Sequence, residues 1–225
     1  MNCLYCFSAT GRTRKIAQFF ASSLSIPVLE LPCTPSECDT AIVVFPVYCQ
    51  SLPEPVWDFL PTLSAKHLVL IAAYGRMSYG NILWEAASLN PAPVIAAACV
   101  PIGHSYLEED LDFDCSKLSP ILERISSPHE ITIPKMHKDL FAYLLPELRS
   151  RLGVRIKRTK ACIDCRLCIK KCPVGAMNEK GPGDHCIRCL RCISVCPVQA
   201  LEYSLTAPMR LYLGKKRCSE LLILL

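Results

Sequence analysis

The sequence predicts an α/β protein with two domains: a doubly wound, five-stranded parallel sheet within residues 1–130 and a small α+β domain within residues 157–206. Three observations support this prediction. In the first half, short apolar segments alternate with segments of helical periodicity, as in a parallel sheet covered by helices on both faces. In the second half, eight cysteines recur at regular spacing. The 225 residues are enough for one full domain and one small one.

Five segments of the first half are expected to form the parallel strands: residues 2–7, 27–31, 40–47, 68–73 and 93–100. Most of them are apolar without a polar periodicity, as strands buried on both faces are. The second is short and lies near prolines, which suits the edge of a sheet. Helical segments separate the strands; in the first, Ile16, Phe20 and Leu24 recur at helical spacing.

The residues between the first strand and the first helix form a candidate anion site. Amide groups and the dipole at a helix N-terminus attract anions. Gly11 would let the backbone approach a ligand closely. The hydroxyls of Ser8, Thr10 and Thr13 can donate hydrogen bonds to phosphate oxygens. A helix cap without a ligand would use the same residue types.

The hexapeptide SATGRT at this place resembles the first loop of the flavodoxin family, S/T-x-T-G-x-T, which wraps the phosphate of FMN. It is neither a Walker loop nor a G-x-G-x-x-G fingerprint. The resemblance implies the flavodoxin-like strand order 2-1-3-4-5, with the ligand at the switch between strands 1 and 3. The phosphate contacts that it implies are Ser8, Ala9, Thr10, Gly11, Arg12 and Thr13.

The loops after the third and fourth strands carry aromatic residues. The segment FPVY, followed by Leu52-Pro53, is similar to the version found in flavodoxin–ferredoxin fusion proteins. The resemblance implies that Tyr48 covers the flavin ring, although a tyrosine packed on the core is the alternative. Loops at the carboxyl ends of parallel strands line the binding crevice. The candidate ring contacts are Pro46, Val47, Tyr48, Tyr74, Gly75 and Tyr79.

Eight cysteines in the second half form two runs of the pattern C-x-x-C-x-x-C-x-x-x-C-P. This is the bacterial two-cluster iron–sulfur spacing, in which the fourth cysteine of each run binds the other cluster. The expected ligands of one [4Fe–4S] cluster are Cys162, Cys165, Cys168 and Cys196. The expected ligands of the other are Cys172, Cys186, Cys189 and Cys192.

The two runs are also an internal repeat, because residues 162–177 recur as residues 186–201 with matching apolar positions. Over residues 155–206 the chain resembles the bacterial 2[4Fe–4S] ferredoxin family. A zinc site or a disulfide framework is the alternative. Zinc is usually held by paired C-x-x-C knuckles, and a tetrahedral site needs neither the third cysteine nor the C-P ending.

Charge is divided unevenly along the chain. Residues 1–130 carry 7 Lys and Arg against 13 Asp and Glu, whereas residues 131–225 carry 18 against 7. A basic half can indicate nucleic acid, but two thiolate-bound clusters would offset part of this charge. We therefore expect redox proteins rather than nucleic acid as partners. The positive charge could attract an acidic partner, but a solvated face is the simpler interpretation.

The remaining segments are expected to connect and close the domains. Residues 131–156 suggest a helical connector interrupted by Pro146, and residues 207–225 a C-terminal tail that packs back on a domain. The acidic segment 104–114 could bind a metal or a basic partner, but a solvated loop is the simpler interpretation. No apolar run is long enough to span a membrane, and no signal peptide is recognised. A reducing cytoplasm is expected.

Taken together, both halves resemble the flavodoxin–ferredoxin fusion family. The resemblance implies an electron-transfer iron–sulfur flavoprotein that passes electrons between two [4Fe–4S] clusters and FMN. Two alternatives stay open: an FMN-dependent reductase of an organic substrate, and an iron–sulfur redox sensor without flavin. The histidines are isolated in sequence, so no catalytic residues are predicted.

Overall fold

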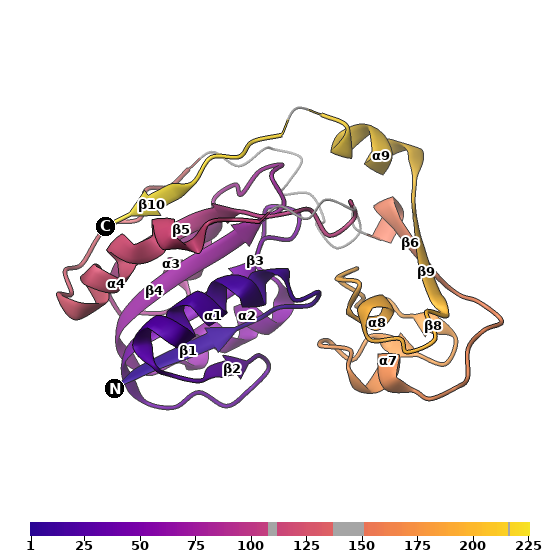
Figure 1. Ribbon diagram of the computed structural model, residues 1–225, viewed down its shortest axis with the longest axis horizontal. Helices are drawn as coiled ribbons and strands as arrows, with labels where there is room; N and C mark the ends of the chain where they lie inside the picture. Colours follow the sequence, from indigo (N-terminus) through magenta and orange to yellow (C-terminus); the bar gives the residue numbers. More distant parts are fainter. Residues whose placement is uncertain (108–111, 137–150, 216) are drawn as a thin grey trace. The chain divides into compact units, whose positions relative to one another are not determined.

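The computed structural model describes residues 1–107, 112–136, 151–215 and 217–225 (Figure 1). The chain divides into two compact units. The first comprises Met1–Asp139 and Arg217–Leu225, and the second comprises Leu140–Lys216. The second unit is therefore an insertion in the chain of the first, between its main part and its last nine residues.

The first unit is built on a six-stranded, mostly parallel sheet with the order β10-β5-β4-β3-β1-β2. Its strands are β1 (Asn2–Cys6), β2 (Val28–Glu30), β3 (Cys38–Pro46), β4 (Ala65–Tyr74), β5 (Val94–Pro101) and β10 (Leu222–Leu224). The first five are parallel to their neighbours, and β10 runs antiparallel to β5 (Figure 1). The sixth strand was not predicted, because three apolar residues at the end of a tail carry no local strand signal.

Helices cover both faces of this sheet. They are α1 (Arg12–Leu24), α2 (Glu54–Phe59), α3 (Ile82–Ser88) and α4 (Ser119–Ser126), with 3-10 turns at η1 (Leu60–Thr62) and η2 (Cys115–Leu118). Phe20 of α1 and Ile121 of α4 share one core with Leu4 of β1. On β1 the next side chain, Tyr5, lies 4.8 Å from the ring of Phe59 in α2. Because side chains alternate along a strand, α1 and α2 lie on opposite faces, and burial of each such side chain contributes about 1.5–3 kcal/mol.

The second unit is a small α+β structure. Strand β6 (Val154–Arg158) pairs antiparallel with β9 (Leu201–Leu205), and β7 (Met177–Asn178) pairs with β8 (Gly181–Pro182). Its helices are α7 (Leu167–Lys170), α8 (Arg191–Ser194) and α9 (Ala207–Leu213). Helices α7 and α8 each begin inside a cysteine motif, so the fold of this unit is arranged around the two motifs.

The expected connector ends earlier than predicted, and parts of the connector and of the acidic segment lie outside the described residues. The expected connector extends to residue 156, but Val154 already begins β6. The helical periodicity of that connector lies within residues 137–150, outside the described residues, as do residues 108–111 of the acidic segment. Among the helices of the described ranges, none combines the length and the apolar composition needed to cross a membrane.

Candidate metal centres

The two cysteine motifs follow the same backbone path, displaced by 24 residues. In the first, the amide of Ile169 donates to the carbonyl of Arg166 over 3.1 Å, and in the second Ile193 donates to Leu190 over the same distance. Residues with positive φ also occur in pairs 24 positions apart: Asp164 and Arg188, Arg166 and Leu190, and Gly175 and Gln199. The sequence repeat is thus a structural repeat.

The left-handed residues of each motif give its loop the shape of an anion site. Asp164 and Arg166 have φ values of 52° and 57° and stand on either side of Cys165. Alternating handedness turns successive amide groups to the same side, which forms a concave nest suited to anions and iron–sulfur clusters. A non-glycine residue held in this conformation costs on the order of 1–3 kcal/mol. Such strain in the same places of both motifs indicates a functional constraint.

The first candidate centre is a cavity in the second unit that is lined by cysteines from both motifs. Its sulfur-bearing residues are Cys162, Cys165, Cys168 and Cys196. These are the three leading cysteines of the first motif and the last cysteine of the second, which is the crossed set that the spacing predicts. Ile163, Ile169 and Val198 also line the cavity and supply apolar walls.

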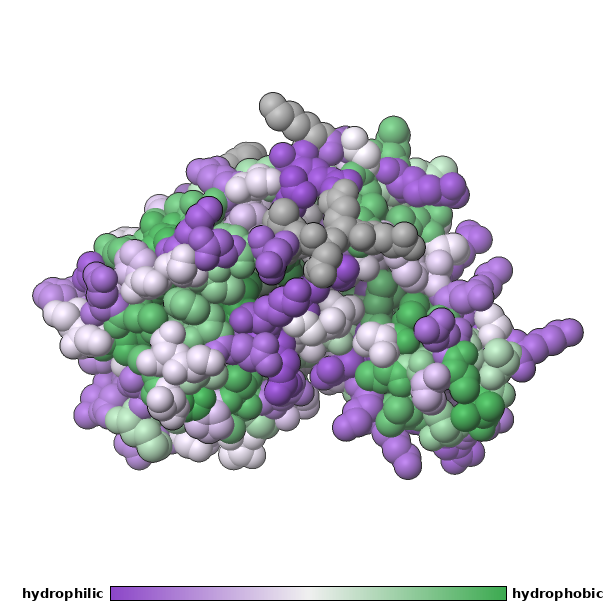
Figure 2. All heavy atoms as spheres, viewed as in Figure 1, coloured by the Kyte–Doolittle hydropathy of each residue, from purple (hydrophilic) through white to green (hydrophobic). Residues whose placement is uncertain are grey.

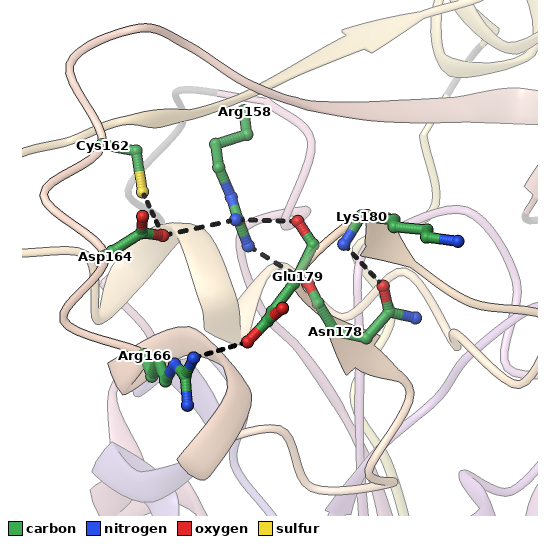
Figure 3. Close-up of polar contacts among 7 residues, drawn as sticks. All are labelled: Arg158, Cys162, Asp164, Arg166, Asn178, Glu179 and Lys180. Atoms are coloured by element: carbon green, nitrogen blue, oxygen red, sulfur yellow. Dashed lines mark hydrogen bonds and ion pairs between the residues drawn. The ribbon is translucent and has the colours of Figure 1, made fainter.

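Hydrogen bonds and ion pairs surround this cavity (Figure 3). The guanidinium of Arg158 lies 3.8 Å from a carboxylate oxygen of Asp164 and donates to the backbone carbonyl of Glu179 over 2.9 Å. Arg166 forms a 2.6 Å ion pair with the Glu179 carboxylate. On the cysteine side, the amide of Ala200 donates to the sulfur of Cys196 over 3.2 Å. A hydrogen bond of this kind to a ligand sulfur is one way in which a protein sets a cluster potential.

The second candidate centre is more deeply buried. Burial, together with smaller contributions from Cys192, Cys186 and Cys172, raises the pKa of the Cys189 thiol to about 12. Burial likewise raises the pKa of Cys192 to about 11, with smaller contributions from Cys186, Cys172 and Cys168. The first motif therefore supplies Cys172 to the neighbourhood of the second motif, which is the reciprocal crossed set. A metal group binding here would have to displace the thiol protons.

The donor chemistry of both centres fits [4Fe–4S] groups. Each crossed set offers four thiol side chains, and each motif offers a loop shaped for an anion. Within the described part of the chain, no three His, Cys, Asp or Glu side chains lie close enough together to hold a single metal ion.

In the first unit, the loop predicted to bind phosphate lies between β1 and α1. Ser8 is buried, and its hydroxyl oxygen accepts a 3.1 Å hydrogen bond from the amide of Arg14. Ser8 thus interacts with the first turn of the helix, as the capping alternative requires. Gly11 has φ of 88°, and no neighbouring atom lies within 4 Å of where its Cβ would be. Thr13 is buried, whereas Thr10 and Arg12 are half-buried.

The loop after β3 is a tight turn. Pro46 ends β3, and the amide of Val47 donates to the carbonyl of Ala73 over 2.8 Å. Tyr48 is half-buried and exchanges backbone hydrogen bonds with Ser51. Its ring lies edge-on to Phe7 at 6.4 Å, so the tyrosine contacts the core as the alternative interpretation stated.

The loop after β4 is occupied by other parts of the first unit. Tyr74 is fully buried, and its hydroxyl donates to the Glu220 carbonyl over 2.6 Å. A Cβ on Gly75 would lie 2.6 Å from the imidazole of His104, so this glycine makes room for a histidine. Tyr79 is half-buried against Tyr74. Neither the role of Glu220 nor that of His104 was predicted, because both residues are distant in sequence from β4 and no local pattern marks their contacts.

Comparison with known protein families gave matches within the second unit. Two family models match, both described as a 4Fe-4S binding domain, one over residues 159–175 and one over residues 183–202. Each match contains one of the two cysteine motifs. Neither the curated proteins nor the solved structures gave a match. The C-terminal part of the chain thus carries two 4Fe-4S binding domains of the ferredoxin type.

Proposed function

We propose that this protein transfers electrons and holds two [4Fe–4S] clusters in its second unit. The observation that carries the proposal is the cavity lined by three cysteines of one motif and the last cysteine of the other. One cluster would be held by Cys162, Cys165, Cys168 and Cys196, and the second by Cys172, Cys186, Cys189 and Cys192.

A bound [4Fe–4S] cluster supplies a reversible one-electron couple whose potential depends on hydrogen bonds, burial and nearby charge. The chain provides each of these. The amide of Ala200 donates to Cys196, Ile169 and Val198 form apolar walls at the first centre, and Arg158 and Arg166 lie beside it. Groups of this kind orient the ligands and keep water from the sulfur atoms.

The first unit carries a second part of the proposal, which is FMN binding as in the flavodoxin–ferredoxin fusion family. It is supported by the position of residues 8–13, which follow the carboxyl end of β1, between β2 and β3 in the sheet. In an open α/β sheet, this switch point is where ligands bind. The hydroxyls of Thr10 and Thr13 and the open backbone at Gly11 would contact the phosphate. Among the aromatic ring contacts, Tyr48 and Tyr79 are the two that burial leaves partly accessible.

The test is anaerobic purification followed by iron, sulfide and flavin analysis and an EPR-monitored reductive titration. About eight irons that accept two electrons per protein would support the proposal. One FMN per chain would support the flavin part of the proposal. Turnover of an organic acceptor by the purified protein would favour the reductase alternative. Eight irons with no flavin after reconstitution would overturn the FMN part alone. A preparation that binds zinc, or whose iron cannot be reduced, would overturn the electron-transfer function.

A further inference from the structure

The cysteines of the first candidate centre are more exposed than those of the second. Cys165 is exposed, and the adjacent Ile163 is 62% exposed. At the equivalent places in the second motif, Cys189 is 8% exposed and Ile187, the counterpart of Ile163, is half-buried. An electron crosses between proteins most readily where a cluster lies closest to the surface, because transfer falls steeply with distance. The first centre is therefore the better point of exchange.

Apolar side chains at the rim of the first centre are open to solvent. Ile163 and Val198 both line its cavity and are 62% and 38% exposed. In Figure 2, apolar surface on the second unit is bordered by hydrophilic side chains. An apolar centre inside a polar rim is the usual composition of a protein–protein interface. Exposed apolar residues beside a redox centre thus indicate a docking surface.

The charge around this surface is positive. Residues 151–215 carry 13 Lys and Arg against 4 Asp and Glu, and two clusters with their thiolates would leave a net charge of about +5. The acidic residues at the rim, Asp164 and Glu179, lie in ion pairs with Arg158 and Arg166. Lys160, Lys170 and Lys171 are exposed. A positive surface attracts a partner with the opposite charge and accelerates its docking.

We propose that electrons enter and leave the protein through the centre formed by Cys162, Cys165, Cys168 and Cys196, and that an acidic redox protein docks on the rim around it. We name as the docking rim the exposed lining residues Ile163 and Val198 together with three exposed lysines that lie within two residues of lining residues in the chain, which are Lys160, Lys170 and Lys171. This inference rests on the proposed electron-transfer function. It adds the centre at which electrons enter and leave and the charge of the partner protein.

The experiment is stopped-flow oxidation of the reduced, full-length holoprotein by two probes. Oxidised rubredoxin serves as the acidic one-electron acceptor and cytochrome c as the basic one. Wild type is compared with Ile163→Glu in the docking rim and with Leu211→Glu. Leu211 is a matched control, because it is an apolar residue of the same unit that is 77% exposed and does not line the cavity.

Ile163→Glu should slow electron transfer to rubredoxin about tenfold, while Leu211→Glu should leave the rate unchanged. The wild-type rate with rubredoxin should fall as ionic strength rises, as for opposite charges. Because Ile163→Glu could disturb the cluster, the test is repeated with a second docking-rim variant, Lys170→Glu/Lys171→Glu. Its control is Arg210→Glu/Lys215→Glu, which makes the same change of charge elsewhere in the unit. Only proteins with full iron content are compared.

Equal rates for the docking-rim variants and their controls would overturn the inference, as would a rate with rubredoxin that rises with salt. Both results would leave the electron-transfer function standing. That function would fail instead if the wild-type holoprotein passed electrons to neither probe and to no small chemical acceptor.

Discussion

The two cysteine motifs of the second unit share one backbone path but differ in how far solvent reaches them. Their cysteines and left-handed positions coincide after a shift of 24 residues. Several residues between the cysteines do not coincide; for example, Arg166 is exposed in the first motif, and Leu190 is buried at the equivalent place in the second. The repeated residues thus determine the ligand geometry, and the residues that are not repeated determine the environment of each centre.

The largest expected effect comes from removing single cysteines. Cys165→Ala and Cys196→Ala should each lose the same EPR signal and about four of eight irons, because both belong to the first crossed set. Cys172→Ala should lose the other signal. Iron analysis and EPR of the three variants check this, with Cys33→Ala, outside both motifs, as the control. If Cys172→Ala instead removed the same signal as Cys165→Ala, the crossed arrangement would be wrong.

A smaller effect is expected from the residues that distinguish the two motifs. Leu190→Ala removes a buried side chain and should lower the free energy of unfolding by about 2–3 kcal/mol. Arg166→Ala changes the equivalent position but removes only an exposed ion pair, which is worth less than about 1 kcal/mol. Chemical denaturation of the anaerobic holoproteins measures both. Equal losses would contradict the difference in burial.

The two centres should also differ in reduction potential. Reduction adds negative charge, which solvent stabilises better than a buried site does, and the cysteines of the first centre are the more exposed ones. We expect the first centre to have the more positive potential, by more than about 60 mV, which is a tenfold difference for one electron. A potentiometric titration followed by EPR checks the order of the two potentials. The same titration of Cys172→Ala assigns the potential of the first centre, because this variant should lose the second cluster. The opposite order would show that burial does not control the potentials.

The smallest effect is expected at the ion pairs beside the first centre. Glu179→Gln removes the carboxylate that Arg166 contacts at 2.6 Å. Both side chains are exposed, so the free energy of unfolding should change by less than about 1 kcal/mol. Thermal or denaturant unfolding of the holoprotein measures it. A loss of several kcal/mol would mean that this pair is part of the scaffold of the first centre.

The sequence was most informative where the pattern was local. Cysteine spacing predicted the two 4Fe-4S binding motifs that the family models match, because ligand spacing within a motif is set by the chain itself. The crossed assignment of the cysteines stays a prediction. Apolar segments predicted the parallel strands for a similar reason. The sixth strand, β10, was missed because it pairs with β5, more than a hundred residues earlier. Contacts such as that of Gly75 with His104 arise only from tertiary packing, so no sequence pattern indicated them.

The proposal of FMN binding depends on the resemblance of residues 8–13 to a flavodoxin loop. These residue types have more than one structural interpretation. Ser, Thr and Gly before a helix suit both a phosphate and a helix cap, and Ser8 does bond to the first turn of α1. Tyr74 shows why ring contacts were harder to predict. Its hydroxyl donates to Glu220 in the last segment of the chain, so burial leaves it no surface for a ligand.

The most direct test of the central claim is anomalous diffraction at the iron edge from anaerobically grown crystals of the full chain. The account predicts two iron clusters, one bound by Cys162, Cys165, Cys168 and Cys196 and one, with more buried ligands, bound by Cys172, Cys186, Cys189 and Cys192. Zinc in place of iron, a single cluster, or clusters held by uncrossed cysteine sets would contradict it.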